Sequence, residues 1–174
     1  IRQKSTNRII QMRELFILRH AEAVNAKYNT DDFDRQLSND GVLEARQLGK
    51  RCNEAHLLPS VIYSSSARRA LTTAIIFAEE TNFPQAKIVV LPKLYDLYPD
   101  QFMDIILETS DDFSKVMVVG HNPVLTVFLN IYTIEGIVNL PTGTLVQVEY
   151  PNNETWQSIK ESKGNIKAIW KPQW

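Results

Sequence analysis

The sequence predicts an α/β domain with a largely parallel sheet, and two patterns carry this prediction. Short apolar runs alternate with longer segments whose apolar residues recur at helical spacing, which is typical of strands joined by crossover helices. One run, Val116–Val119, is apolar throughout, as expected for a strand that is buried on both faces of a parallel sheet. A chain of 174 residues suits one domain, so we expect residues 1–174 to form a single domain.

The short apolar runs are the predicted strands. In chain order they are Leu15–Leu18, Val61–Tyr63, Ile88–Leu91, Val116–Val119, Thr144–Tyr150 and Ile166–Trp170. The turn signal Pro151-Asn152-Asn153 separates the last two, and we expect the final strand at an edge of the sheet.

Helices are predicted in the intervening segments, in chain order Asp40–Glu54, Ser66–Glu80, Gln101–Glu108 and Pro123–Ile131. Ser38 is a good N-cap for the first of these helices. Pro123 suits the first helical position of the last one, with Asn122 as the cap before it.

The composition of the chain argues against several classes of function and of site. The formal net charge of −1 argues against a general attraction to nucleic acid or to an anionic membrane. The one cysteine, Cys52, excludes an internal disulfide and a multi-thiolate metal site, and its helical spacing predicts a core residue. No apolar run approaches the roughly 18 residues that span a membrane, so we expect a cytoplasmic protein. Residues 1–8 are basic without the apolar core of a secretory signal, and we expect residues 1–12 to be a poorly ordered leader or a cloning remnant.

Polar residues follow several of the predicted strands at the point where each strand ends. Arg19 and His20 follow the first strand, and His121 follows the fourth; the second is followed by Ser64, Ser65, Ser66, Arg68 and Arg69. Ligands of open α/β sheets bind at the carboxyl ends of the strands, and guanidinium groups and helix N-termini bind phosphate. Taken singly, each group has a structural explanation: a surface ion pair, a capped helix start or a satisfied histidine. Their conjunction favours a phosphoryl site, whereas His56 has no such setting and is interpreted as structural or surface.

The same residues lie in motifs that resemble those of the histidine phosphatase superfamily, and within it the small SixA-type phosphohistidine phosphatases. The motifs run in order across most of the chain: Leu18-Arg19-His20-Ala21-Glu22-Ala23, Asp34-Arg35-Gln36-Leu37-Ser38, Ser65-Ser66-Ala67-Arg68-Arg69-Ala70, Val119-Gly120-His121-Asn122-Pro123 and Leu140-Pro141-Thr142-Gly143. The resemblance implies a phosphoglycerate-mutase-like fold, a three-layer α/β/α arrangement with a mostly parallel central sheet.

The resemblance also implies site roles and neither a metal nor a cofactor. His20 would be the nucleophile that forms a phosphohistidine intermediate. Arg19 and Arg69 would hold the phosphoryl oxygens, and His121 would bond to or neutralise the transferring group. Arg35 is a candidate further phosphate ligand, although Gln36 replaces the usual proline after it. Arg68 is expected to be the solvated neighbour of Arg69.

One departure from the family pattern bears on the substrate. Larger phosphomonoesterases and mutases of the family use a glutamate as general acid, in a segment that here runs from Pro92 to Tyr98 and contains no glutamate. Asp96 is a candidate general acid there, with an exposed loop carboxylate as the plainer interpretation. An alkyl phosphate ester needs a proton for its leaving alkoxide, whereas a protonated imidazole leaves a P–N bond easily. The sequence therefore favours phosphohistidine as substrate.

These observations lead to one leading hypothesis and two alternatives. The leading hypothesis is a metal-independent phosphatase for phosphohistidine on a protein, of the histidine-phosphotransfer or phosphocarrier type. The first alternative is a small-molecule phosphomonoesterase of the same superfamily. The second is a non-catalytic domain that binds a phosphorylated ligand or a partner. A mutase is disfavoured because the short chain offers little to hold a bisphosphorylated intermediate.

Overall fold

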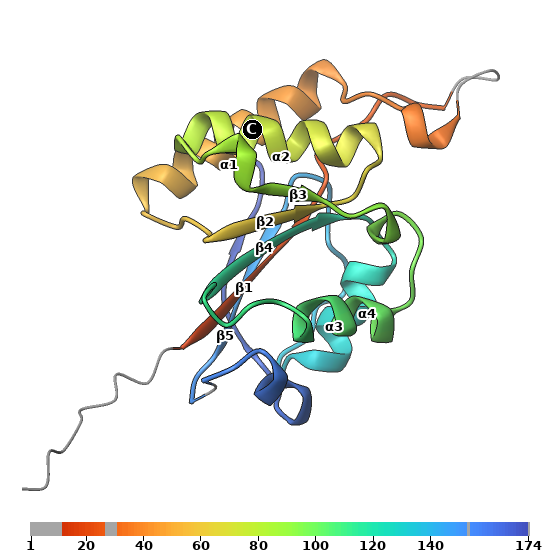
Figure 1. The fold of residues 1–174 in the computed structure, drawn as a ribbon. Helices are drawn as coiled ribbons and strands as arrows, with labels where there is room; N and C mark the ends of the chain where they lie inside the picture. Colours follow the sequence, from red (N-terminus) through yellow and green to blue (C-terminus); the bar gives the residue numbers. More distant parts are fainter. Residues whose placement is uncertain (1–11, 27–30, 153, 174) are drawn as a thin grey trace, which may run out of the picture.

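The apolar runs of the chain form one mixed sheet in the computed structural model, which describes residues 12–26, 31–152 and 154–173 (Figure 1). The strands are β1 (Arg13–Arg19), β2 (Val61–Ser64), β3 (Ile88–Val90), β4 (Lys115–Gly120), β5 (Leu145–Tyr150) and β6 (Asn165–Trp170). Their order across the sheet is β3-β2-β4-β1-β5-β6. The first four strands are parallel to one another, while β5 and β6 are antiparallel additions, so the sheet is mostly parallel.

Helices cover both faces of the sheet, which gives the three-layer α/β/α arrangement (Figure 1). On one face lie α1 (Asn39–Glu54) and α2 (Arg68–Thr81); on the other lie α3 (Pro99–Leu107) and α4 (Val124–Tyr132). The period-2 alternation of the strands divides the core accordingly. Phe16 packs in the cluster under α1 and α2, and its neighbour Ile17 packs in the cluster under α3 and α4. Cys52 belongs to the first cluster and is fully buried, which confirms it as a core residue.

Two helices begin later than the sequence predicts. The helix predicted from Ser66 begins at Arg68, because Ala67 has an extended backbone and its N–H donates to Ser65 Oγ at 3.3 Å. The helix predicted from Pro123 begins at Val124, with Pro123 itself in the cap position. Asn122 nevertheless accepts a hydrogen bond from the Thr126 N–H at 3.3 Å, as a residue near a helix start does. Ser38 caps α1 as predicted, since its Oγ accepts from the Gly41 N–H at 2.9 Å.

The remaining sequence predictions about the ends of elements differ by one or two residues from the observed bounds. Leu91 and Thr144 lie just outside β3 and β5, and β6 is an edge strand as predicted. Residues 1–11 and Asn153 lie outside the described residues, so the predictions for the leader and for the third turn residue are left open. Among the described residues, no helix combines the length and the apolar character needed to cross a membrane.

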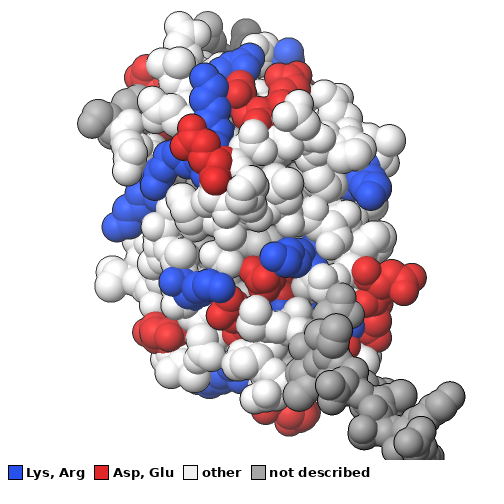
Figure 2. All heavy atoms as spheres, turned by 90° about the vertical axis from the view of Figure 1, so that its left-hand side faces the viewer, with Lys and Arg blue, Asp and Glu red and all other residues white. Residues whose placement is uncertain are grey.

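Four short 3-10 helices connect the larger elements: η1 (Asp32–Asp34), η2 (Gln85–Lys87), η3 (Pro92–Leu94) and η4 (Gln157–Glu161). At the end of the molecule where the parallel strands begin, Lys and Arg side chains are interspersed with Asp and Glu (Figure 2). The parallel strands end at the opposite end of the molecule. The polar residues singled out in the sequence lie at these carboxyl ends of the strands.

Candidate active site

The parallel register of β1, β2 and β4 brings three strand ends to one place. Arg19 pairs with Gly120 across β1 and β4, and the His20 N–H donates to the Gly120 carbonyl at 3.1 Å. His121 follows directly, and the ring centroids of the two histidines are 5.1 Å apart. Ser65, at the end of β2, lies 2.8 Å from the His121 ring. Groups that are up to 101 positions apart in sequence therefore share one site because neighbouring parallel strands end together.

His20 presents one ring nitrogen as a free base. Its Nδ1 lies 2.7 Å from the Ala21 carbonyl oxygen, which can only accept, so Nδ1 carries the proton. Its Nε2 accepts a hydrogen bond from Arg69 Nε at 3.2 Å. Burial, aided by the charges of Arg69, Arg19 and Arg35, lowers the pKa of His20 to about 4, so the ring is neutral at pH 7. An unprotonated imidazole nitrogen of this kind can act as a nucleophile once the Arg69 N–H releases its lone pair.

Two arginines belong to this site, Arg69, which is buried, and Arg19, which is half-buried. Arg69 comes from the first turn of α2 and is 6% exposed, while its neighbour Arg68 points to solvent as predicted. Arg19 is anchored through Nη1, which donates to the Leu140 carbonyl at 2.8 Å. Its Nε is buried and has no hydrogen-bond partner among the described residues, so this donor is available to an incoming oxygen. Guanidinium donors of this kind match the oxygens of a phosphoryl group.

His121 has a hydrogen-bond arrangement that selects one tautomer. Ser65 Oγ accepts from the Ala67 N–H, and among the described residues the acceptor for its own proton is His121 Nε2 at 2.8 Å, which favours donation from Ser65 to His121. The proton of the neutral imidazole then lies on Nδ1, a buried nitrogen without a partner among the described residues. Burial first, and then the charges of His20 and Arg69, lower the pKa of His121 to about 3. His121 is therefore placed as a neutral N–H donor rather than as a cation.

A carboxylate that sequence reasoning did not single out, Asp32, lies beside Arg69. Asp32 Oδ2 accepts from Arg69 Nη2 and from the Tyr95 hydroxyl, both at 2.9 Å, and Oδ1 accepts from Arg35 Nη1 at 2.9 Å. These bonds, that from Arg35 foremost, lower the pKa of Asp32 to about 2, so it is ionised at neutral pH. The spacing of three residues between Asp32 and Arg35 is a sequence signal that could have revealed the pair.

The structure places the remaining predicted residues less centrally. Arg35 bonds to Asp32 and, through Nε, to the Val24 carbonyl at 2.9 Å, so its guanidinium reaches the site by way of Asp32. Asp96 is exposed and lines a cavity of about 400 Å³ that also contains His121 and Tyr95. The carboxylate in contact with Arg69 is that of Asp32 rather than that of Asp96. His56 is exposed on the chain after α1, in agreement with its interpretation as a surface residue.

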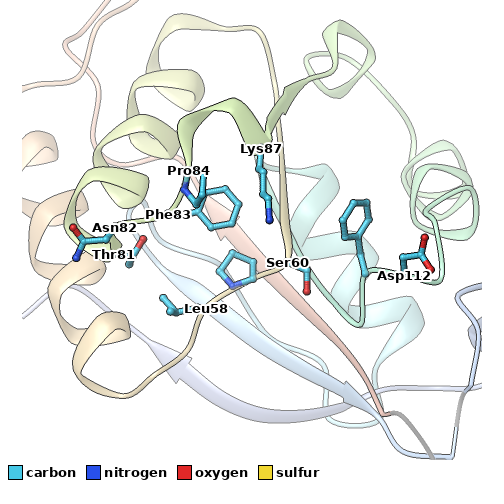
Figure 3. Close-up of a pocket in the computed structure, with 10 residues that line it drawn as sticks. Leu58, Ser60, Thr81, Asn82, Phe83, Pro84, Lys87 and Asp112 are labelled. Carbon is cyan, nitrogen blue, oxygen red and sulfur yellow. The ribbon is translucent and has the colours of Figure 1, made fainter.

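A second cavity, of about 410 Å³, lies at the other end of the sheet (Figure 3). Phe83 and Phe113 contribute to its wall, and its ionisable lining residues are Lys87 and Asp112. Its lining contains neither a histidine nor an arginine. Within the described ranges, no group of three or more His, Cys, Asp or Glu side chains is placed to hold a metal ion.

Several solved structures share this fold. A SixA protein of Agrobacterium tumefaciens, assigned as a phosphohistidine phosphatase, is 23% identical with a TM-score of 0.79 and covers 92% of this chain and 98% of its own. The protein histidine phosphatase SixA complexed with tungstate is 21% identical with a TM-score of 0.72, over 91% and 97% of the two chains. A mycobacterial glucosyl-3-phosphoglycerate phosphatase is 14% identical with a TM-score of 0.67, over 93% and 100%. No curated protein matches the sequence.

The family model of the histidine phosphatase superfamily (branch 1) matches residues 15–105, more than half of the chain. The matched range includes Arg19, His20 and Arg69, and His121 joins them through the register of β4. The sequence match and the shared phosphoglycerate-mutase-like fold agree: the chain belongs to the histidine phosphatase superfamily.

Proposed function

We propose that this protein hydrolyses phosphohistidine on a protein substrate, without a metal, through a covalent phosphohistidine on His20. Membership of the superfamily supports phosphatase activity in general. The observation that carries the narrower proposal is the protonation state of the site. Both histidines are neutral at pH 7 and Asp32 is ionised, so these groups offer a nucleophile and hydrogen-bond donors but no strong acid.

The reaction takes two displacement steps. The lone pair of His20 Nε2 attacks phosphorus, a new P–N bond forms, and the P–N bond to the substrate imidazole breaks. The substrate imidazole carries its own proton, so it leaves as neutral histidine without taking a proton from the enzyme. Water then attacks the phosphorylated His20, which restores the free imidazole and releases inorganic phosphate. Arg69, Arg19 and the Nδ1–H of His121 would stabilise the charge on the transferring oxygens in both steps.

Phosphohistidine and a phosphate ester differ in whether their leaving group needs a proton from the enzyme. An alkoxide leaving group requires a proton from a nearby acid, and the carboxylate that bonds to Arg69 has a pKa of about 2 and has none to give. Imidazole leaves without that help. Both SixA structures described above are named as histidine phosphatases, which is consistent with this substrate class.

A small-molecule phosphomonoesterase remains the second candidate. The cavity of about 400 Å³ beside His121 could hold a small leaving group, and Asp96 on its wall is the residue that would then act as acid. Two structural neighbours are named as small-molecule phosphatases, the mycobacterial enzyme above and an α-ribazole-5′-P phosphatase from Escherichia coli at 12% identity.

The test compares two substrates with and without a chelator. Wild-type protein and His20→Ala are incubated with a phosphohistidine protein and with p-nitrophenyl phosphate. We expect phosphohistidine hydrolysis that survives chelation and falls about a thousandfold or more in His20→Ala. Acid-free mass spectrometry should show one phosphoryl group on the wild type during turnover. Faster hydrolysis of the ester than of phosphohistidine would favour the second candidate, and full activity in His20→Ala would overturn the mechanism.

A further inference from the structure

Helix α4 carries exposed apolar residues on its outer face, beside the polar Thr126 and Asn130. Leu125, Phe128 and Leu129 are fully buried against the sheet. On the opposite side Val127 and Ile131 are 41% and 44% exposed, four residues apart and therefore on one face of the helix. An amphipathic helix would carry polar residues at these positions. The outer face of α4 thus exposes apolar surface that folding of this chain does not cover.

The exposed face begins at the active site. Val124 and Val127 line the cavity of about 400 Å³ that contains His121, and Tyr98, at the start of α3, forms part of the same wall. Tyr98 is the N-cap residue of α3, where its N–H donates to Gln101 Oε1 at 2.8 Å, and it is 77% exposed, an unusual degree for an aromatic residue. We call Tyr98, Val124, Val127 and Ile131 the apolar rim.

The place of the apolar rim beside the cavity indicates whether a small molecule or a protein would cover it. A phosphoryl group that reaches His20 brings its carrier against the cavity beside His121, because this cavity and the nucleophile share the His121 ring as a wall. The rim then continues from the cavity along α4 to Ile131. The eight residues from Val124 to Ile131 span about 10 Å along the helix axis. A small molecule seated in the cavity would leave this outer part of the rim in water, whereas a protein surface would cover it.

We infer that the apolar rim is the docking surface for the protein that carries the phosphohistidine. This inference rests on the proposed function and adds the place where the partner binds. The partner would present apolar side chains around its phosphohistidine, because burial of exposed Tyr, Val and Ile side chains is favourable only against apolar groups. Acidic side chains stand beside Tyr98, since Asp96 and Asp100 are both exposed, and they favour a basic edge on the partner.

The test separates docking from chemistry by the size of the substrate. The variants are Val127→Asp, Ile131→Asp and Tyr98→Ala, each in the full chain. The matched control is Leu43→Asp, which places the same charge at a 51% exposed apolar position of α1 on the other face of the sheet. Substrates are a histidine-phosphotransfer domain and a phosphocarrier protein, both phosphorylated with phosphoramidate, and free phosphohistidine. Thermal midpoints verify that each variant is folded.

We expect kcat/KM for at least one phosphoprotein to fall about tenfold or more in the rim variants, mainly through KM, and to stay within twofold in Leu43→Asp. Activity on free phosphohistidine should stay within twofold in Ile131→Asp, which lies outside the cavity, and in Leu43→Asp. If the wild type prefers a phosphoprotein over free phosphohistidine but the rim variants do not change that preference, the docking inference is wrong and the proposed function stands. A wild type without such a preference also overturns docking. If it hydrolyses neither form of phosphohistidine, the proposed function itself fails.

Discussion

At the scale of single residues, the site depends on protons that are held in fixed places. Ala21 and Arg69 together assign the two nitrogens of His20, and Ser65 assigns those of His121. Burial keeps both rings neutral, which a nucleophile and a neutral donor each require. The sequence shows that these residues are present, but only their contacts show which nitrogen faces the substrate.

The first prediction concerns the titration of His20. Because its pKa in the folded chain is about 4 against an ordinary value of 6.5, the unfolded chain takes up the proton first as the pH falls. Its contribution to stability is therefore complete above about pH 6.5 and is lost as the pH falls toward 4. NMR of the ring Cε1–H, with exposed His56 as the reference signal, should show His20 unprotonated down to about pH 5. A His20 signal that titrates near 6.5 would contradict the buried, neutral nucleophile.

The second prediction concerns Ser65. Ser65→Ala removes the hydroxyl that holds the His121 tautomer, so kcat should fall about tenfold to a hundredfold while KM changes little. Nitrogen-15 NMR of His121 should show the proton redistributed between its ring nitrogens. Ser65→Thr, which keeps the hydroxyl, is the control and should retain the wild-type tautomer. An unchanged tautomer in Ser65→Ala would show that Ser65 serves packing alone.

At the scale of elements, the short helix η1 brings a charge that competes with substrate. Asp32 occupies Arg69 Nη2, one of the donors that a phosphoryl oxygen would use, and Tyr95 holds it there. A phosphorylated substrate must therefore displace the carboxylate or share Arg69 with it. Arg35, a candidate further phosphate ligand from the resemblance, is engaged by the same carboxylate.

The third prediction follows from this competition. Asp32→Asn keeps the shape of the side chain but removes its negative charge, so inorganic phosphate should bind about fivefold to tenfold more tightly. Phosphate itself titrates between pH 5 and 8 whereas the carboxylate of Asp32, with a pKa of about 2, keeps its charge, so measurement at one fixed pH isolates the difference that this charge makes. Inhibition constants for phosphate measure it. Asp34→Asn, in the same 3-10 helix, is the matched control; weaker phosphate binding in Asp32→Asn would instead make Asp32 a support for Arg69.

The fourth prediction concerns the contact between helix α1 and the segment after His20. A Cβ at Gly41 would stand 2.0 Å from the Glu22 carbonyl oxygen, which is backbone and cannot swing away. Gly41→Ala should therefore lower the free energy of unfolding by about 1–3 kcal/mol, and activity with it. At Gly120 the nearest atom to an added Cβ is a Leu125 side-chain carbon at 3.5 Å, an ordinary contact. Gly120→Ala should change the free energy of unfolding far less; equal losses in denaturant titrations would contradict this steric account.

At the scale of the whole molecule, groups of the candidate active site at the carboxyl ends of the strands also affect the stability of the fold. Arg19 Nε and His121 Nδ1 are buried and bond to none of the described residues, which is costly until an anion bonds to them. A phosphate that binds only the folded chain should therefore stabilise the whole fold.

The fifth prediction gives the magnitude of this stabilisation by phosphate. At a phosphate concentration about a hundred times its Kd, the thermal midpoint should rise by about 5 to 10 °C. Arg69→Ala should lose most of the shift, whereas Arg68→Ala, at the exposed neighbouring position, should keep it. Differential scanning calorimetry distinguishes the two outcomes. An equal shift in both variants would mean that phosphate stabilises the protein away from this site.

Much of this architecture is local and so could be predicted from sequence. The strand and helix periodicities, the Ser38 cap and the buried Cys52 depend on neighbours along the chain. Arg19, His20, Arg69 and His121 were singled out because strand ends are recognisable as sequence features. The late start of α2 was not predictable, because it depends on a hydrogen bond of the Ser65 side chain.

The sequence by itself determined the kinds of group available, two arginines and two histidines that follow buried strands, and its motifs determined the family. Only the tertiary structure decided which nitrogen of His20 is the free base, that Asp32 rather than Asp96 bonds to Arg69, and where apolar surface meets the cavity. The physical reason is that proton positions and ion pairs depend on distances of a few ångströms between segments far apart in the chain. Sheet register, which places β1 beside β4 and β4 beside β2, is what sets those distances.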